Sequence, residues 1–414
     1  MLNNKQEEVI ILVSKGKNIF VSGMAGTGKT TIIKKIIEMY GSTFCIGKTS
    51  TTGTSALLLK GSTLHSYLGV GLGNGSIDNI IKRIKKNRLK YDRWLLLDLL
   101  IIDEISMMEP NLLEKLENIA RIIRNNNKIF GGIQLLFSGD FCQLPPVGCE
   151  KLCLTSKIWN KCIDDVVVLD IIMRQNDKYF QNVLNKVRIG NIDSDVRECL
   201  DSRVGVKLTN EYGIEPTKLY CVNKDVDSIN EKMLNKLSAQ GAEFYEYDME
   251  FTKYRKEADI EKFLKYCSPK EKLQLCIGAQ VILLKNLDLP QGLANGSRGV
   301  VTDFVDDLPL VKFLNGYETV IDYAVWEVEE NDIHMFDAHQ IPLKIGYALT
   351  IHRSQGCSLD LVQIDLSKIF EYGQAYVALS RVKYLQGLSI ISIDYNNILA
   401  HPDAVKYYEK ITTK

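Results

Sequence analysis

The stretch GMAGTGKTT at residues 23–31 has the composition and spacing of a loop that binds nucleotide phosphates. It fits the pattern G-x-x-x-x-G-K-T and lies between an apolar run and isoleucines at helical spacing. In such a loop the backbone N–H groups and the helix dipole face the phosphates, the lysine reaches the β- and γ-phosphates, and the threonine holds Mg²⁺. A glycine-rich turn without a ligand is the alternative, which the combination of strand, Lys-Thr pair and helix disfavours. The residues expected to contact the nucleotide are Gly23, Ala25, Gly26, Thr27, Gly28, Lys29, Thr30 and Thr31.

A pair of carboxylates, Asp103 and Glu104, follows the apolar run LLII. Ligands of open α/β sheets gather at the carboxyl ends of the strands, so this pair is expected near the phosphate loop. Asp103 would hold Mg²⁺, directly or through water, and Glu104 would polarise the attacking water as a general base. A simple strand end is the alternative, but the pair together with an upstream phosphate loop is typical of an ATPase.

A third polar group, Gln143 in SGDFCQLPPV (138–147), follows another apolar run and precedes a stiff Pro-Pro turn. An amide beside the nucleotide can hydrogen-bond the γ-phosphate or the water, and the spacing alone leaves this role and a structural one equally open. Arg174 and Arg381 lie beyond the first α/β stretch. An arginine that meets the transition-state charge accelerates phosphoryl transfer by ~10³–10⁵, although most arginines are surface salt-bridge partners.

The elements that must position these groups alternate between strand-like and helical patterns. Their apolar, β-branched runs suit parallel sheets that are covered on both faces. One set of runs comprises residues 19–21, 43–47, 99–104, 132–140 and 166–170, and a second comprises 217–223, 341–350, 361–366 and 388–394. From about residue 270 to 340, short strands alternate with Asn-Gly and Gly turns, which is typical of a small antiparallel β-domain inserted into the second α/β unit.

Composition and charge exclude several classes of protein. The chain has 45% apolar and 25% charged residues, no apolar run near the ~18 residues of a membrane span, and no export or mitochondrial address, so a soluble intracellular enzyme is expected. A formal net charge of zero means that a nucleic-acid ligand would need a locally basic groove. The ten cysteines have no disulfide framework, and those at 142–162 lack the paired C-x₂-C of a zinc site, so buried thiols are expected.

The run IKRIKKNRLK at residues 81–90 carries six basic residues and has two interpretations. It could bind phosphates, or it could be an amphipathic helix whose lysines are solvated. The isoleucines at 77, 80, 81 and 84 have helical spacing, which favours the solvated face.

Longer motifs in the chain resemble those of the petite-integration-frequency (Pif) DNA helicases, which belong to superfamily 1, group B, with RecD-type enzymes as relatives. The motifs are IARIIRNNNKIFGGIQLLFSGDFCQLPPV (119–147), GSTLHSYLGVGLG (61–73), GAQVILLKN with NGSRGVV, IPLKIGYALTIHRSQG (341–356) and GQAYVALSRV (373–382). They occur in the family's order, and the resemblance runs from Gln6 to about residue 395.

The resemblance implies an α/β protein with two RecA-like parallel-sheet domains in tandem and a small inserted β-barrel-like domain. The first RecA-like domain would span residues 1–165, with a small insertion at about 60–78. The second would combine 166–269 with 342–414, and the β-domain would occupy 270–341. ATP would bind in the cleft between the RecA-like domains, and single-stranded DNA would cross both.

The resemblance also assigns roles to individual residues. Gln6 would recognise adenine, and Arg174 and Arg381 would be arginine fingers. The expected catalytic residues are then Lys29, Glu104, Gln143, Arg174 and Arg381, and the expected metal ligands are Thr30 and Asp103.

The residues expected to face DNA fall into three segments. Small hydroxyls and backbone amides in KTSTTGTSA suit sugar-phosphate contacts without base reading, with a plain polar loop as the alternative, and this segment touches DNA in the family. His65 could stack on a base or meet a phosphate, although a lone histidine is more often structural. The motif ALTIHRSQG grips DNA in the family. The candidates are Thr49, Ser50, Thr51, Thr52, His65, Thr350, His352, Ser354 and Gln355.

Together these features predict an ATP- and Mg²⁺-dependent DNA helicase that translocates 5′ to 3′ on single strands and unwinds duplex or forked DNA. We expect the protein to be a monomer in solution, without a membrane partner. Its expected location is the nucleus or the cytoplasm, and its origin could be viral or microbial. The alternative is a non-unwinding ATPase, stimulated by single strands, that remodels nucleic acid or displaces proteins. A small-molecule kinase is disfavoured, because it would not require the second α/β unit.

Overall fold

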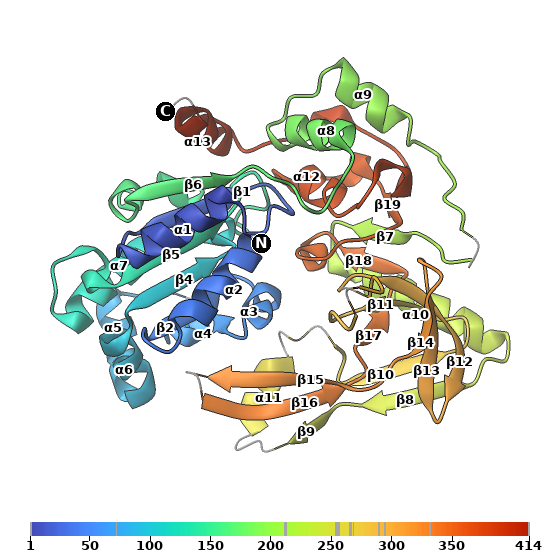
Figure 1. The fold of residues 1–414 in the computed structure, drawn as a ribbon, viewed down its shortest axis with the longest axis horizontal. Helices are drawn as coiled ribbons and strands as arrows, with labels where there is room; N and C mark the ends of the chain where they lie inside the picture. The colour runs from blue at the N-terminus through green and yellow to red at the C-terminus, as the bar shows by residue number, and fades with distance from the viewer. Residues whose placement is uncertain are drawn as a thin grey trace. The chain divides into compact units, whose positions relative to one another are not determined.

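The fold is shown in Figure 1 as a computed structural model, which describes residues 2–71, 73–210, 213–252, 257–264, 267, 269–288, 290–293, 295–330 and 333–412. The chain forms two compact units, residues 1–173 with 400–414 and residues 174–399. Because the second unit is one uninterrupted stretch, the chain passes between the units twice, after Met173 and before Ala400. Every helix in the described ranges is too short or too polar to cross a lipid bilayer.

The first unit is built on a six-stranded sheet in the order β3-β2-β4-β5-β1-β6, in which every pairing is parallel. Its strands are β1 Ile19–Gly23, β2 Ile46–Ser50, β3 Ser62–Thr63, β4 Leu99–Asp103, β5 Gln134–Gly139 and β6 Asp165–Leu169. Alternate side chains of a strand point to opposite faces, so Phe20 joins one apolar cluster while Ile19 and Val21 join another. Both faces of the sheet are therefore covered, as the apolar runs predict.

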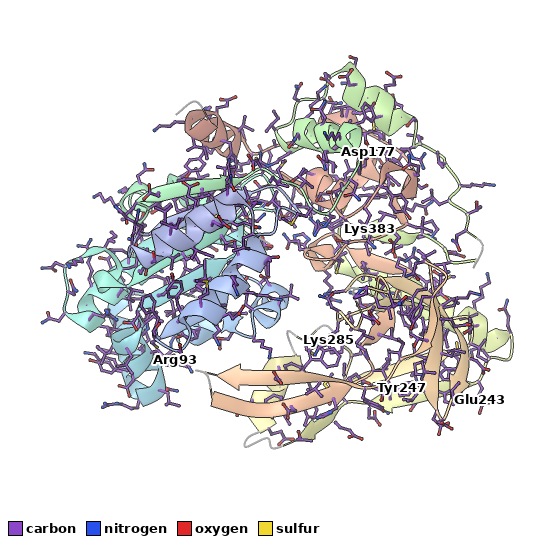
Figure 2. The ribbon with its side chains drawn as sticks, in the orientation of Figure 1. Arg93, Asp177, Glu243, Tyr247, Lys285 and Lys383 are labelled. Carbon is purple, nitrogen blue, oxygen red and sulfur yellow. The ribbon has the colours of Figure 1, made fainter. Side chains whose placement is uncertain are left out.

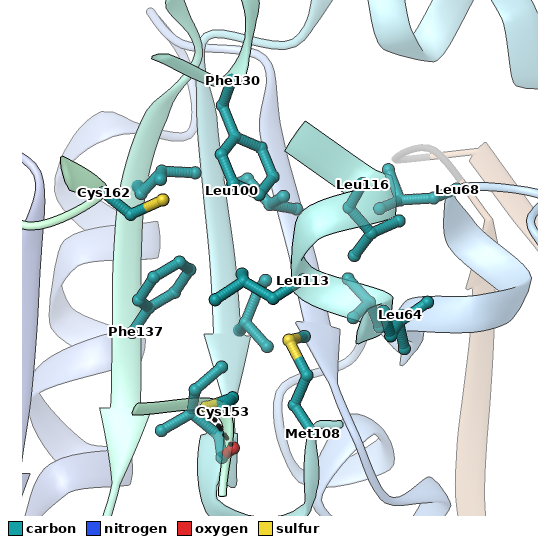
Figure 3. Close-up of a cluster of buried hydrophobic side chains, with 14 of the residues drawn as sticks. Leu64, Leu68, Leu100, Met108, Leu113, Leu116, Phe130, Phe137, Cys153 and Cys162 are labelled. Atoms are coloured by element: carbon teal, nitrogen blue, oxygen red, sulfur yellow. Dashed lines mark hydrogen bonds between the residues drawn. The ribbon is translucent and has the colours of Figure 1, made fainter. Parts of the chain in front are cut away.

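Helices cover both faces of this sheet. They are α1 Asn4–Ser14, α2 Lys29–Tyr40, α3 Gly53–Leu58, α4 Leu64–Tyr67, α5 Ile77–Lys86, α6 Arg88–Leu96, α7 Pro110–Arg124 and α13 Pro402–Thr412, with the 3₁₀ turns η1 Ile105–Met107, η2 Ile129–Gly132, η3 Cys153–Thr155 and η4 Trp159–Lys161. Helices α1 and α2 pack on one face. On the other face, Leu113 and Leu116 of α7 meet Leu100 and Phe137 of the sheet (Figure 3).

The basic run lies mainly on α5. Ile80, Ile81 and Ile84 are buried there, whereas Lys82 and Lys85 are exposed. The amphipathic helix with a solvated basic face is thus the interpretation that the structure supports.

The second unit contains a four-stranded parallel sheet in the order β18-β7-β19-β20. Its strands are β7 Thr217–Tyr220, β18 Ala348–Thr350, β19 Val362–Ile364 and β20 Leu388–Ile390. The accompanying helices are α8 Lys178–Arg188, α9 Ser194–Asp201, α10 Asn223–Ala239 and α12 Gln374–Leu379, with the turns η5 His352–Ser354, η6 Leu366–Lys368, η7 Leu385–Gly387 and η8 Tyr395–Asn397. Asp177, labelled in Figure 2, caps α8 by accepting hydrogen bonds from the N–H groups of Tyr179 and Phe180. The expected second parallel sheet is confirmed.

Antiparallel sheets are inserted between β7 and β18. They have the orders β10-β8, β14-β13-β12-β11-β17 and β15-β16-β9. Their elements are β8 Phe244–Asp248, β9 Glu250–Thr252, α11 Glu257–Leu264, β10 Lys272–Cys276, β11 Gln280–Leu283, β12 Arg298–Val305, β13 Leu308–Phe313, β14 Glu318–Val320, β15 Ala324–Glu330, β16 Ile333–Gln340 and β17 Leu343–Ile345. These sheets are open rather than closed into a barrel, which corrects the barrel-like expectation. The antiparallel strands also begin before residue 270, since β8 pairs with β10.

The compact units differ from the expected domain limits at two places. Strand β6 belongs to the first unit, because Ile19 of β1 pairs with Asp165 and Gly23 with Leu169, so a boundary after residue 165 would cut through it. Helix α13 also belongs to the first unit rather than the second, because its Tyr408 packs in the cluster around Phe20.

Candidate nucleotide site and strand-contacting residues

The phosphate loop joins the end of β1 to the start of α2. Gly26 and Gly28 have φ angles of +81° and +85°, in the left-handed region that side chains rarely adopt. The Lys29 ammonium donates to the carbonyl oxygens of Gly23 at 2.6 Å and Met24 at 2.9 Å, so this side chain folds over the loop. The Thr27 hydroxyl is buried and donates to the Met24 carbonyl at 2.9 Å, which holds the loop closed at this point.

Gln6 lies directly above this loop. Its Oε1 accepts from the Asn3 N–H at 3.1 Å, and its own N–H donates to Asn3 Oδ1 at 2.9 Å, which caps α1 and fixes the side chain. Its Nε2 is buried without an acceptor among the described residues. A methyl group on Gly28 would lie 2.8 Å from this nitrogen. A buried, fixed donor over the loop fits the predicted contact with a nucleotide base.

The carboxylate pair lies at the end of β4. Asp103 is buried, and its Oδ2 accepts from the Ser55 hydroxyl at 2.7 Å. Glu104 has φ +53° and ψ +44°, a left-handed conformation that costs a non-glycine residue of the order of 1–3 kcal/mol and is concentrated at functional sites. The Thr51 hydroxyl donates to the Glu104 carbonyl at 2.7 Å, which helps to hold this conformation.

A tight turn after β5 presents Gln143. The Gln143 N–H donates to the Asp140 carbonyl at 2.9 Å, and the Cys142 N–H donates to Asp140 Oδ1 at 3.1 Å. Because the strand order contains β4-β5-β1, this turn, the carboxylate pair and the phosphate loop follow neighbouring strands at one sheet edge.

The donors expected for Mg²⁺ are compatible with that ion. Thr30 supplies a hydroxyl and Asp103 a carboxylate, and Mg²⁺ prefers such oxygen ligands together with water and substrate phosphates. Among the described residues, no group of three His, Cys, Asp or Glu side chains is placed to hold a metal ion. Burial also raises the pKa of the Cys162 thiol to about 12, which keeps it protonated.

The hydroxyl segment at 49–52 divides into buried and accessible parts. Thr49 and Ser50 are fully buried, and their hydroxyls donate to the carbonyls of Ile101 at 2.6 Å and Asp103 at 3.2 Å. Those two side chains hold β2 to β4 and do not reach the surface, contrary to the expected DNA contact. Thr51 and Thr52 are half-buried and remain candidates.

His65 lies in the short helix α4 and is half-buried. Burial lowers the pKa of its imidazole more than the nearby Glu109 carboxylate raises it, so the ring is neutral at pH 7. Next to it, the Tyr67 ring is covered by the Arg93 guanidinium at 5.0 Å (Figure 2 labels Arg93). A neutral imidazole can stack on a base or donate one hydrogen bond to a phosphate, but it does not form an ion pair with it.

The second unit brings the two predicted arginines together around Ser380. Arg174 donates to the Ser380 carbonyl at 3.1 Å, and Arg381 donates to the Ser380 hydroxyl at 2.8 Å. Arg381 is buried and also donates to the carbonyls of Val377 at 2.8 Å and Ser354 at 3.4 Å. These contacts disfavour the surface salt-bridge interpretation of Arg381.

The motif that follows β18 places its four candidates close together in sequence and space. The Thr350 hydroxyl accepts from the Arg353 N–H at 3.2 Å, and the buried Ser354 hydroxyl donates to the Ile351 carbonyl at 2.7 Å. His352 Nε2 lies 3.5 Å from a Glu371 oxygen. Gln355 is half-buried, and its Nε2 has no acceptor among the described residues. Gln355 thus offers a donor to a ligand, whereas Thr350 and Ser354 fix the turn.

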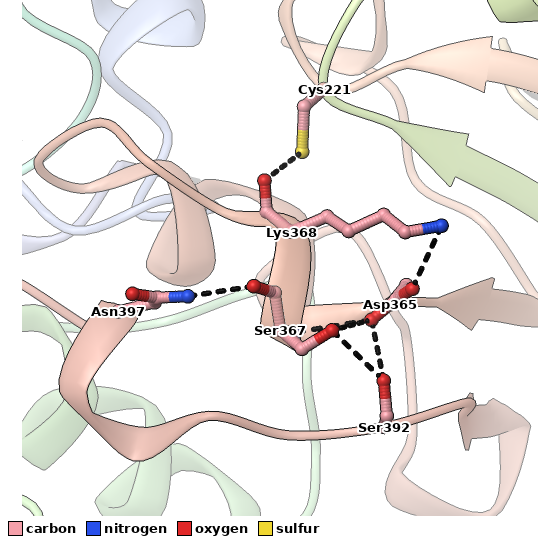
Figure 4. A network of polar contacts seen from close by, with 6 residues as sticks. All are labelled: Cys221, Asp365, Ser367, Lys368, Ser392 and Asn397. Carbon is pink, nitrogen blue, oxygen red and sulfur yellow. Dashed lines mark hydrogen bonds and ion pairs between the residues drawn. The ribbon is translucent and has the colours of Figure 1, made fainter.

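A polar network lies at the carboxyl ends of β7 and β19 (Figure 4). Asp365 accepts from the hydroxyls of Ser367 at 2.6 Å and Ser392 at 2.7 Å and lies 3.3 Å from the Lys368 ammonium. Burial raises the pKa of Asp365, but these bonds together outweigh it and lower the pKa. The network borders a cavity of about 230 Å³ that Cys221 helps to line.

Sequence reasoning missed three residues with contacts in these sites. Ser55 holds Asp103, and Tyr408 contacts β1 and the Gln143 turn. Gln175 is buried and donates to the carbonyls of Ser380 at 3.1 Å and Val382 at 2.8 Å. The sequence feature that could have indicated Gln175 is its position directly after Arg174.

Comparisons with known proteins agree with this geometry. A family model described as PIF1-like helicase matches residues 1–198, and one described as the 2B domain of DNA helicase Pif1 matches residues 261–304. The chain is 37% identical over 500 residues to uncharacterized protein 030L of Invertebrate iridescent virus 6, covering 99% of this chain and 94% of that protein. It is 38% identical over 419 residues to the ATP-dependent DNA helicase PIF1 of Xenopus laevis, covering 99% of this chain but 64% of that protein.

Two solved structures are similar over nearly the full chain. The Pif1 helicase of Candida albicans is 36% identical with a TM-score of 0.76, and 99% of each chain is covered. A Bacteroides Pif1 helicase in complex with ADP-AlF3 and ssDNA is 28% identical with a TM-score of 0.65, covering 100% of this chain and 97% of that one. Since the motifs, the two parallel sheets and these likenesses agree over the whole sequence, the chain belongs to the Pif1-like helicase family.

Proposed function

We propose that this chain is an ATP-dependent DNA helicase that translocates 5′ to 3′ on single-stranded DNA and unwinds duplex or forked DNA. The proposal rests mainly on one observation. The phosphate loop, the Asp103-Glu104 pair and the Gln143 turn follow the ends of neighbouring strands. Its family supports the same activity, because relatives carry the name ATP-dependent DNA helicase and one structure holds ADP-AlF3 and ssDNA. The chain spans 64% of the length of the Xenopus relative. The activity of that whole protein is therefore proposed for this chain and not taken over as a fact.

In the proposed reaction the first unit binds ATP and activates water. Lys29 would exchange its bonds to loop carbonyls for bonds to phosphate oxygens, and the Gln6 amide would hold the adenine. Glu104, fixed in its left-handed turn, would accept a proton from the attacking water. Gln143 would hydrogen-bond the γ-phosphate or that water. Thr30 and Asp103 would hold Mg²⁺, which when bound neutralises phosphate charge.

We assign Arg174 and Arg381 to the charge that develops on the transferred phosphate. Both are held by Ser380, and a guanidinium keeps its charge when it is buried, so each can act as an arginine finger. Gln175, bonded to the same carbonyl as Arg174, would orient that arginine.

DNA binding would depend mainly on the sugar-phosphate backbone and on base stacking. Thr51, Thr52, His65, His352 and Gln355 are the proposed contacts that remain accessible at least in part. Contacts of this type give little sequence preference and a strong dependence of affinity on salt. The protein would be a monomer in solution.

The test is ATP-dependent strand displacement on two matched duplexes, one with a 5′ single-stranded tail and one with a 3′ tail. Unwinding of the 5′-tailed duplex alone is expected, and Lys29→Ala, which removes the phosphate-contacting ammonium, should abolish it. Unwinding of only the 3′-tailed duplex would refute the direction. ATP hydrolysis that single strands stimulate, without unwinding of either duplex, would replace the helicase with the remodelling ATPase.

A further inference from the structure

The C-terminal helix α13 follows the second unit in the chain but packs in the first. Ala404 and Tyr408 lie in the same buried cluster as Phe20 and Phe141, and the partly buried Tyr407 packs against it. His401 fixes the start of the helix, because its Nδ1 accepts from the Asp403 N–H at 3.2 Å while its Nε2 lies 2.7 Å from the Glu150 carbonyl oxygen. Nε2 therefore carries the proton and donates to that oxygen.

The Tyr408 hydroxyl joins two of the elements that form the nucleotide site. It lies 2.6 Å from the Ser22 hydroxyl, and the Phe141 N–H donates to it at 3.2 Å. Ser22 immediately precedes Gly23, whose carbonyl accepts from Lys29, and Phe141 lies inside the turn that presents Gln143. All three partners of this contact are buried, so water does not compete for the bonds.

Both covalent links between the units therefore end at parts of this site. The chain leaves the first unit after Met173, whose N–H donates to the Gly26 carbonyl of the phosphate loop at 2.8 Å. It returns before Ala400 and reaches Ser22 and the Gln143 turn through Tyr408.

We propose that Tyr408 is a positioning residue of the ATPase: its hydroxyl holds the base of the phosphate loop in register with the Gln143 turn, so that α13 is a working part of the catalytic unit. Tyr408 does not touch the nucleotide, and it acts through Ser22 and Phe141. The inference rests on the proposed ATP hydrolysis and adds a residue from the far end of the chain to it.

The test compares Tyr408→Phe with Tyr407→Phe in the full chain. The first substitution removes the bridging hydroxyl and keeps the ring in the cluster. The second is the same chemical change in the same helix, where the ring packs against Phe141 and Trp159 at centroid distances of 5.9 and 6.4 Å. We expect kcat for ATP hydrolysis to fall about threefold to tenfold in Tyr408→Phe, because the two buried hydrogen bonds of the hydroxyl, with Ser22 and with the Phe141 N–H, are lost. KM for ATP should change less than about twofold, and Tyr407→Phe should retain kcat.

Unchanged kcat in Tyr408→Phe, or an equal fall in Tyr407→Phe, would overturn the assignment. Ser22→Ala removes the bond between Ser22 and Tyr408 but keeps the bond from the Phe141 N–H, and it replaces Tyr408→Phe if that variant does not fold. In the double variant of Ser22 and Tyr408, kcat should equal that of Tyr408→Phe, because Ser22→Ala deletes one of the two bonds that Tyr408→Phe already removes. If the two substitutions lowered kcat by the product of their separate effects, the hydrogen bond between Ser22 and Tyr408 would not be the interaction that each of them removes. A wild-type chain without ATP hydrolysis would instead refute the proposed function.

Discussion

Replacing Thr51 with valine should slow ATP hydrolysis without weakening ATP binding. Glu104 is held at φ +53° and ψ +44°, at a cost of the order of 1–3 kcal/mol. The surrounding structure must supply that energy, and Thr51 contributes two bonds. Its hydroxyl donates to the Glu104 carbonyl at 2.7 Å, and its N–H donates to the Asp103 carbonyl at 3.2 Å.

The magnitude follows from the hydroxyl alone, because valine has the shape of threonine and keeps the backbone bond. A hydrogen bond of this kind contributes about 1 kcal/mol, so the catalytic orientation of Glu104 should become less populated and kcat should fall about fivefold. KM for ATP should stay within about twofold, since Lys29 and the phosphate loop are untouched.

The matched control is Thr49→Val. It removes a hydroxyl two residues earlier, within β2, that donates to the Ile101 carbonyl at 2.6 Å and is fully buried. That bond holds β2 to β4 before the strand reaches Glu104, so its loss should lower the free energy of unfolding and leave kcat near wild type. ATP hydrolysis is measured without DNA, because Thr51 is also a proposed DNA contact. The reasoning is refuted if Thr51→Val hydrolyses ATP like wild type, or if Thr49→Val slows hydrolysis equally.

Three other perturbations test separate parts of the site. Gln6→Leu removes the fixed donor above the loop, so KM for ATP should rise about fivefold while KM for GTP changes little, as steady-state hydrolysis of both nucleotides would reveal. Arg381→Ala should still bind a fluorescent ATP analogue, but its kcat for ATP hydrolysis should be ~10³-fold lower than that of wild type. Equal kcat in wild type and Arg381→Ala would exclude Arg381 as an arginine finger. Asp365→Asn tests pH dependence by urea unfolding at pH 7 and pH 3. Hydrogen bonds lower the folded pKa of Asp365 below its unfolded value near 4, so its contribution to stability is present above about pH 4 and is lost as pH falls through the folded pKa. The difference in the free energy of unfolding between wild type and Asp365→Asn should therefore be smaller at pH 3 than at pH 7. An equal difference at both pH values would contradict the assignment of the lowered pKa to these hydrogen bonds.

The strands that carry the nucleotide site were predictable because one physical rule governs them. A buried parallel strand must be apolar on both faces, so the runs before Gly23, Asp103 and Asp140 stand out in the sequence. The polar residues directly after each run then fall at one edge of the sheet. The order β4-β5-β1 could not be predicted from the runs alone, because it depends on which strands pair across the intervening helices.

The limits of the units were less predictable, because long-range pairing decides them. Strand β6 has the same apolar character as the strands of the second sheet, and only its register with β1 assigns it to the first unit. The apolar positions 404, 407, 408 and 411 predict an amphipathic helix but do not indicate which sheet it covers. The contact of Tyr408 with Ser22 spans nearly the entire sequence, so no local pattern could predict it.

The burial of Thr49 and Ser50 shows that a motif does not indicate which of its side chains are accessible to a ligand. A run of hydroxyl residues after a strand predicts a polar surface, yet these hydroxyls donate to carbonyls of β4, at Ile101 and Asp103. A hydroxyl can donate its hydrogen bond to a carbonyl of the protein instead of to water or a ligand. The composition of a segment does not show which of these partners it has. As a result, the segment that presents Thr51 and Thr52 is bonded to the strand that ends at Asp103, next to Glu104. A force that DNA exerts on Thr51 would therefore act on the backbone of Asp103 and Glu104 through the two hydrogen bonds that Thr51 donates to their carbonyls.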